Sequence, residues 1–139
     1  SECNQFIGTS HGGKSTKIYA IVDELGNPIS FLLSGGQIHD SNTALSRLET
    51  IDIHGSRISA DRAYGCEEIC EYIIHLCDTT QTQYKKTWFM DWHLYKQRHL
   101  VEYFFHKLKQ FRRIVTRYDK LASCFFAFIH IVAIAILLK

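Results

Sequence analysis

The chain has 139 residues, of which 46% are hydrophobic and 22% charged, which is enough to bury a core and typical of one globular domain rather than a disordered segment. Its longest apolar run, 125–138, is shorter than the roughly 20 residues that cross a bilayer, so we expect no membrane span. Five cysteines, an odd number, argue against a disulfide framework and favour a reduced cytosolic compartment.

The net charge of +2 hides an uneven distribution. Residues 1–84 contain five Lys or Arg against eleven Asp or Glu, whereas residues 85–120 contain ten against three. A basic segment of this kind is most often a solvated helix face, but here arginines alternate with aromatic residues, as at Phe111–Arg113. We therefore interpret 85–120 as a surface for nucleic acid.

The N-terminal half predicts a hairpin after a loose start. Residues 1–15 are polar and have no hydrophobic period, so we expect a flexible approach. Residues 16–23 and 29–34 are rich in β-forming side chains. The Gly-Asn-Pro sequence within 24–28 suits the turn between them, which predicts an antiparallel pair.

Beyond the hairpin, helix and strand patterns alternate. Asp40 or Ser41 can cap a helix that runs through Leu48. A short strand is predicted at 57–60, ending in Asp61. We expect three further helices and one more strand, at 67–77, 92–117, 121–138 and 79–84 respectively.

The cysteines of the helix predicted at 67–77 have a packing interpretation. Cys66, Cys70 and Cys77 are spaced so that they can share the inner face of this helix. Zinc binding with His75 is the alternative, but no C-x2-C pair supports it. We expect these thiols to pack in the core.

Four residues of the helix predicted at 92–117 lie on one face. Tyr95, Arg98, Glu102 and Lys109 have offsets of 0, 3, 7 and 14, which span an arc of roughly 60° at about 100° per residue. An exposed ion pair stabilises by only ~0.2–1 kcal/mol, so a carboxylate between two cations indicates phosphate chemistry. The plainer alternatives are that Glu102 pairs with Arg98 or His106 one turn away, and that Tyr95 packs at the helix start.

The spacing Tyr95-x2-Arg98-x3-Glu102-x6-Lys109 resembles the signature of bacterial insertion-sequence transposases of the DDE type, in the insertion-sequence-five group. The resemblance fails between Thr79 and Met90. Four other blocks are similar to motifs of the same group: Gly12–Ala20, Gly36–Asp40, Ala60–Tyr64 and Phe111–Leu121.

The resemblance implies an α/β fold of the RNase H-like type over residues 16–139, with a mixed sheet flanked by helices, long C-terminal helices and the first strand missing. Asp61, at a strand end, and Glu102, on a later helix, would be the catalytic residues and the ligands of Mg²⁺ (or Mn²⁺), which prefers carboxylates. It also implies DNA contacts by Tyr95 and Lys109. From their charge and chemistry we expect phosphate contacts by Arg98, Arg112, Arg113 and Arg117 as well.

The implied function is DNA transposition by metal-dependent phosphodiester hydrolysis and strand transfer. The partners would be double-stranded DNA at transposon ends and target sites, in the bacterial cytoplasm and at the nucleoid, and the apolar last helix suits a homo-oligomer. The first aspartate of the family has no counterpart in 1–14, and Asp23 lies on the wrong strand to replace it. We therefore expect the C-terminal part of a catalytic domain, inactive alone.

Two alternatives to an incomplete transposase stay open. One is a non-catalytic DNA-binding remnant that regulates or poisons a full-length enzyme. The other is a product without function, which an exposed sheet edge would make prone to aggregate. Metal-dependent cleavage distinguishes the first alternative from the transposase.

Overall fold

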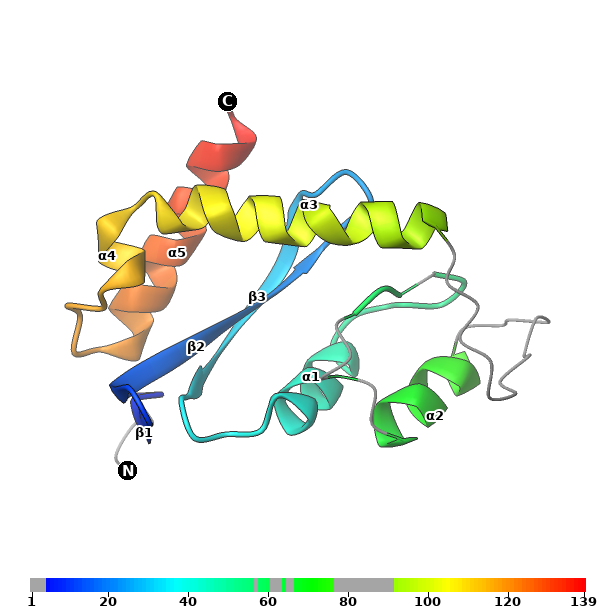
Figure 1. Ribbon diagram of the computed structural model, residues 1–139, viewed down its shortest axis with the longest axis horizontal. Coiled ribbons are helices and arrows are strands. Elements are labelled where there is room, and N and C mark those ends of the chain that lie inside the picture. Colours follow the sequence, from blue (N-terminus) through cyan, green and yellow to red (C-terminus); the bar gives the residue numbers. More distant parts are fainter. Residues whose placement is uncertain (1–4, 57, 61–63, 65–66, 77–91) are drawn as a thin grey trace. The chain divides into compact units, whose positions relative to one another are not determined.

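The computed structural model describes residues 5–56, 58–60, 64, 67–76 and 92–139. They form two compact units, one made of the segment up to Ile38 together with His99–Lys139, the other of His39–Arg98, and each is described by itself. The elements are labelled in Figure 1: β1 (Gly8–Ser10), β2 (Gly13–Val22), β3 (Pro28–Gly35), α1 (Asp40–Leu48), α2 (Glu67–Leu76), α3 (Trp92–Lys109), α4 (Arg112–Val115) and α5 (Ala122–Leu137).

The predicted hairpin is confirmed as strands β2 and β3, which pair antiparallel. The register places Ile18 opposite Leu33 and Ala20 opposite Phe31, so two apolar cross-strand pairs lie on one face of the hairpin. Such pairs are the unit by which a sheet is stabilised. This face carries the core of the first unit.

The turn between β2 and β3 is organised by Asp23. Its carboxylate accepts hydrogen bonds from the backbone N–H groups of Leu25 (2.9 Å) and Asn27 (2.8 Å) and from the Asn27 amide (3.0 Å). Gly26 has φ +84°, a conformation that glycine adopts without strain. Burial alone would raise the pKa of Asp23, but the hydrogen bonds from Asn27 and Leu25 outweigh it and lower the pKa.

The loose approach expected over 1–15 is wrong for its second half. Strand β1 pairs antiparallel with β2, with Gly8 opposite Ser15, and β2 begins at Gly13 rather than at Thr16. Gly13 has φ +102°, which closes a tight turn after β1. Polar residues form these strands because they lie on a mainly exposed end of the sheet, where alternation with apolar residues is not required.

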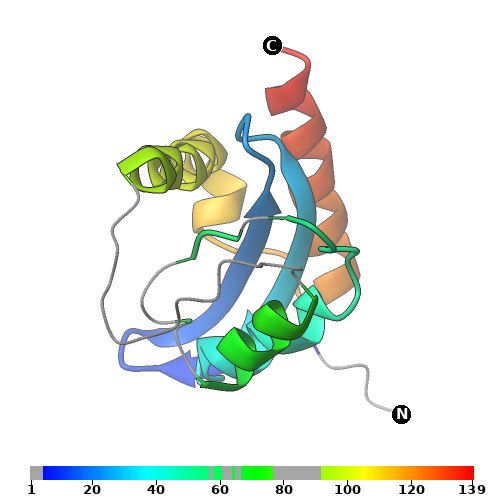
Figure 2. The same ribbon diagram turned by 90° about the vertical axis from the view of Figure 1, so that its right-hand side faces the viewer.

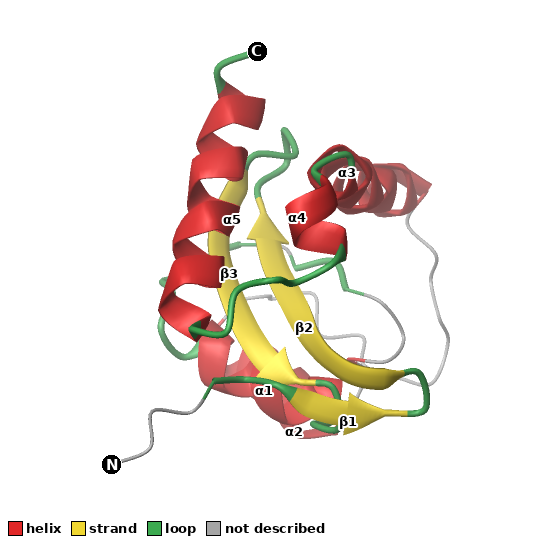
Figure 3. Ribbon diagram, turned by 90° about the vertical axis from the view of Figure 1, so that its left-hand side faces the viewer, coloured by secondary structure: helices red, strands yellow, loops and turns green. Residues whose placement is uncertain are grey.

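The core of the first unit forms where α3, α4 and α5 pack on the hairpin. Figures 2 and 3 show α5 running along β3. Phe104 and Leu108 of α3 and Phe125 and Ile129 of α5 are at most 2% exposed. The predicted last helix is confirmed, with Leu121 and Leu138 as its caps.

The single long helix predicted over 92–117 is wrong after Lys109. The N–H groups of Gln110 and Phe111 bond to carbonyls three residues back, and Phe111 is extended (φ −87°, ψ 105°) before α4 begins. An unbroken helix would keep Val115 in phase with Leu108. The break instead buries Ile114 and leaves Val115 62% exposed.

In the second unit α1 and α2 contact each other, close to where both helices were predicted. The predicted cap of α1 is wrong: His39 is the N-cap, without a side-chain cap bond, and Asp40 lies in the first turn, where its charge suits the helix dipole. Cys70 is a free thiol. Cys66, Cys77 and the strand predicted at 79–84 lie outside the described residues.

The strand predicted at 57–60 is not present where it is described, since 58–60 have no regular structure. β-propensity depends strongly on context, and a strand forms only against a partner. Every strand pair among the described residues is antiparallel, so the mixed sheet is a wrong expectation for them, whereas an architecture of helices with a sheet is confirmed. No described helix is long and apolar enough to cross a membrane.

Candidate functional site

Helix α3 carries all four residues of the spaced motif. It runs without a break from Trp92 to Lys109, and the shared face expected for Tyr95, Arg98, Glu102 and Lys109 stays a prediction for the first two. Side chains are described only from His99 onward, and those of Tyr95 and Arg98 lie outside the described part.

The described end of this face forms a hollow of about 340 Å³. Glu102, His106 and Lys109 line it together with Val101 and Phe105, and the first three are exposed. Their spacing of i, i+4 and i+7 places them one above another on a helix. The structure thus brings together Glu102 and Lys109, two of the residues predicted for the site.

Three residues of the hollow were not predicted as site residues: Val101, Phe105 and His106. For His106 a signal existed, because its offset of 11 from Tyr95 gives about 20°, at the border of the predicted arc. For Val101 and Phe105 there was none, since apolar residues of an amphipathic helix are expected to face the core. Phe105 does pack at the edge of the core.

Buried residues on the opposite face of α3 anchor the helix that carries the hollow. Phe104 is 2% exposed and Leu108 1%, and the Phe104 ring meets Phe31 of β3 with centroids 5.8 Å apart. These two anchors fix the rotation of the helix about its axis. Glu102 and Lys109 are therefore presented to solvent by the packing of the residues between them.

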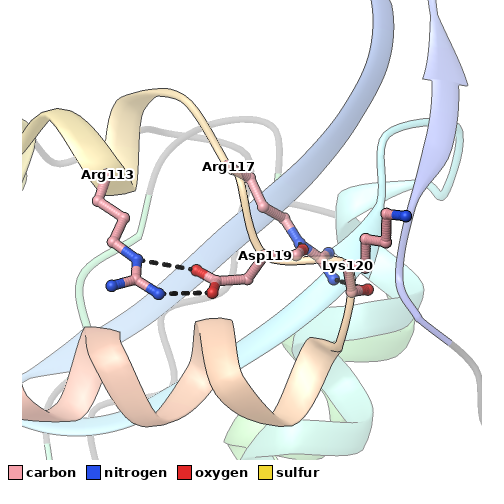
Figure 4. Close-up of polar contacts among 4 residues, drawn as sticks. All are labelled: Arg113, Arg117, Asp119 and Lys120. Carbon is pink, nitrogen blue, oxygen red and sulfur yellow. Dashed lines mark hydrogen bonds and ion pairs between the residues drawn. The ribbon is translucent and has the colours of Figure 1, made fainter.

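Arg113, predicted to contact DNA, is held by a carboxylate (Figure 4). Its Nε and Nη2 donate to the two oxygens of Asp119 at 3.1 and 2.6 Å, and its guanidinium lies 4.9 Å from the centre of the Phe128 ring. The hydrogen bond and charge of Asp119 raise the pKa of Arg113, and the hydrogen bond from Arg113 lowers the pKa of Asp119. This bidentate pair occupies one edge of the guanidinium.

Arg117 is engaged by the protein itself. Its Nε donates to the Asp119 carbonyl (2.9 Å), Nη1 to the Gln5 carbonyl and the Thr16 hydroxyl, and Nη2 to the Lys120 carbonyl (3.1 Å). Figure 4 shows its guanidinium directed at the Asp119–Lys120 backbone. Burial lowers the pKa of Arg117. These contacts tie the segment before α5 to β2 and the N-terminal segment.

Arg112 and Lys109 are different from the two held arginines. Both are exposed, and neither side chain has a hydrogen bond, ion pair or ring contact with another residue in the part of the chain that the structure describes. Lys107, two positions from Lys109, has its Nζ 4.4 Å from the centre of the Tyr103 ring. Lys109 and Arg112 are thus the predicted cations best placed to meet an external anion.

Carboxylates suitable for a metal are sparse in the described part. Asp61 lies outside the described residues, and Asp23 is engaged in its turn. No group of three or more His, Cys, Asp or Glu that could hold a metal occurs among the described side chains. Glu102 still fits as one ligand, because it presents an exposed carboxylate, the donor that Mg²⁺ prefers, at a hollow.

Comparison with known proteins identifies the family of this chain. The model of the family "Transposase DDE domain" matches residues 4–138. A protein of Brucella ovis named "Putative transposase for insertion sequence element IS6501" is 35% identical over 130 residues, which cover 90% of this chain and 99% of the relative. No solved structure matches. The chain therefore belongs to the family of transposase DDE domains.

Proposed function

We propose that this chain supplies the catalytic region of a transposase that cuts and joins DNA, with Asp61 and Glu102 as metal ligands on an RNase H-like fold. The observation that carries the proposal is the placement of Glu102 and Lys109 in one exposed hollow of α3, in a chain of the transposase DDE domain family. A carboxylate and a cation that line the same hollow suit a phosphodiester and the metal that serves it.

The proposed metal is Mg²⁺, or Mn²⁺ in its place. When bound, a pair of such ions activates the attacking oxygen and stabilises the leaving one. Glu102 contributes a carboxylate ligand from a helix held rigidly by Phe104 and Leu108. Asp61 is carried over from the family resemblance as the second ligand.

The cations divide into two groups in this proposal. Lys109 and Arg112, which are exposed and without a described partner, contact DNA phosphates, and Arg113 adds its remaining N–H groups. Arg117 serves mainly to hold the fold, since all three of its guanidinium nitrogens already donate within the protein. Tyr95 and Arg98 keep their predicted DNA-binding roles.

The proposed substrate is double-stranded DNA at the ends of an insertion sequence and at the target, reached in the bacterial cytoplasm at the nucleoid. Phosphate contacts position DNA but do not read its sequence. Recognition of particular ends therefore requires more than these cations. The apolar α5, with Ile131 and Ile134 more than half exposed, is the proposed surface for self-association.

The decisive experiment is metal-dependent cleavage of DNA that carries the ends of the insertion sequence. In an active transposase assembled with this chain, Glu102→Gln should abolish cleavage in Mg²⁺ or Mn²⁺ and leave DNA binding in a gel shift within a few fold. Glu49→Gln, an exposed glutamate at the end of α1, is the matched control and should cleave normally.

Each outcome has a distinct meaning. A parallel loss of cleavage and binding in Glu102→Gln would assign Glu102 a structural role. Binding without cleavage by the assembled protein with the unsubstituted chain, equal with and without metal, would identify a non-catalytic remnant that occupies DNA and could poison a complete enzyme.

A further inference from the structure

The hollow on α3 has an apolar side as well as a charged one. Val101 and Phe105 line it beside Glu102, His106 and Lys109. The Phe105 ring meets the Phe104 ring edge-on, with centroids 5.9 Å apart and an interplanar angle of 66°. Phe104 is buried, so this contact and the packing of Phe105 against the core restrict the Phe105 ring.

This composition does not suit a metal ion alone. A metal cage needs several oxygen or nitrogen ligands, whereas among the described residues that line the hollow Val101 and Phe105 are apolar and Lys109 is a cation. The hollow instead combines an anion-binding end with an apolar surface. Its volume of about 340 Å³ falls in the range of small-ligand sites, ≈ 300–1,000 Å³. A nucleotide has both matching parts, a phosphate and a flat base.

Charge decides how a nucleotide would lie. Glu102 at one end repels a phosphate and Lys109 at the other attracts it. His106 follows Glu102 by four residues and precedes Lys109 by three, so it lies about 4.5 Å from Lys109 along the helix axis. Both side chains can therefore reach the same phosphate, while the base meets the ring of Phe105, as bases commonly stack on aromatic side chains.

We propose that the hollow seats one nucleotide of the DNA strand, with its phosphate between His106 and Lys109 and its base against Val101 and Phe105. His106 is the new element: a positioning residue that donates an N–H to a phosphate oxygen beside the carboxylate of Glu102. The inference rests on the proposed function, which it deepens by naming the contacts of one nucleotide.

The test measures binding of a fluorescein-labelled oligothymidylate to the whole chain by anisotropy, in EDTA so that no metal contributes. His106→Ala should weaken binding about tenfold, the effect of one hydrogen bond to a charged group. His106→Asn keeps an N–H donor and should recover part of the loss. His11→Ala removes another exposed histidine, from the β1–β2 turn, and should bind normally. Thermal melts establish that each variant folds.

A chemical change in the DNA locates the contact. A methylphosphonate, scanned along the strand, removes the charge of one phosphate, and at the seated position it should weaken binding by the unsubstituted chain. With His106→Ala the same methylphosphonate should cost much less, because the two losses concern one contact. An abasic nucleotide next to that position should also weaken binding.

The failures of this inference and of the proposed function are distinguishable. Equal affinity of His106→Ala and the unsubstituted chain, or fully additive losses at every methylphosphonate, would overturn the nucleotide seat alone if cleavage still depends on Glu102. No binding of oligothymidylate by the unsubstituted chain, while duplex DNA is still bound, would overturn the nucleotide seat alone, and no binding of either DNA would overturn both.

Discussion

Arg113 and Asp119 form a bidentate ion pair, with hydrogen bonds of 2.6 and 3.1 Å. The pair joins α4 to the segment that precedes α5, and the Asp119 side chain is only 12% exposed whereas that of Arg113 is 52% exposed. The guanidinium of Arg113 therefore binds a carboxylate of the same chain, although the residue lies in a basic segment. A neighbouring arginine, Arg112, has no such partner among the described residues.

The pair predicts an acid-dependent part of the stability. The pKa of Asp119 is lowered in the folded chain by the hydrogen bond from Arg113, so its contribution is fully present above the unfolded carboxyl value of about 3.9. It is lost as the pH falls below about 4 through the lower folded value. Asp119→Asn should have a lower melting temperature than the unsubstituted chain at pH 7. Between pH 7 and pH 3 its melting temperature should fall less than that of the unsubstituted chain.

Asp23 titrates in the same direction, since its pKa is also lowered, so Asp119→Asn should reduce the acid dependence without removing it. Thermal melts at pH 7, 5 and 3 measure both effects. Parallel pH profiles for the two proteins would show that Asp119 contributes nothing to the acid transition.

Arg117 and Arg112 make a matched pair of arginines with opposite surroundings. Arg117→Ala removes four hydrogen bonds to Gln5, Thr16, Asp119 and Lys120 and should lower the free energy of unfolding by about 2 kcal/mol. Arg112→Ala should change it by no more than about 0.5 kcal/mol, as at most exposed positions. Urea denaturation measures both, and equal losses would contradict the structural role of Arg117.

The hairpin and the last helix could be predicted from sequence because their signals are local. Glycine and proline mark the β2–β3 turn, and α5 is an apolar run interrupted only by Ser123 and His130. The break after Lys109 could not, since no glycine or proline marks it. There the chain leaves the helix so that Ile114 rather than Val115 reaches the core, a choice that depends on the position of β3 and α5.

The candidate site was predictable in its spacing and not in its contacts. Glu102 and Lys109 were identified by their positions on one helix face, which requires only the helical repeat. From sequence alone, Arg113 and Arg117 could not be distinguished from Arg112. Their partners, the Asp119 carboxylate and the carbonyls that bind Arg117, are brought close by tertiary packing, which the sequence does not show. Charge in a sequence does not reveal which cations the fold uses internally.

Two isoleucines of α5 test the packing of this helix. Ile129 is fully buried and Ile131 is 61% exposed, although they are two positions apart. Ile129→Ala should destabilise the chain by about 2–5 kcal/mol, because the cavity adds to the lost transfer energy, and Ile131→Ala by no more than about 0.5 kcal/mol. Urea denaturation measures each. A larger loss at Ile131 would show that its face is covered in solution.

Lys109 and Lys107 test which face of α3 meets DNA. They carry the same charge on different sides of one helix, Lys109 in the hollow and Lys107 over the Tyr103 ring. If Lys109 neutralises one phosphate, Lys109→Ala should reduce the slope of log affinity against log salt for duplex DNA by about 0.9, whereas Lys107→Ala should leave the slope unchanged. Anisotropy at several salt concentrations measures it. Equal reductions in both variants would mean that α3 attracts DNA only through its overall charge. The hollow would then not be a specific phosphate-binding site.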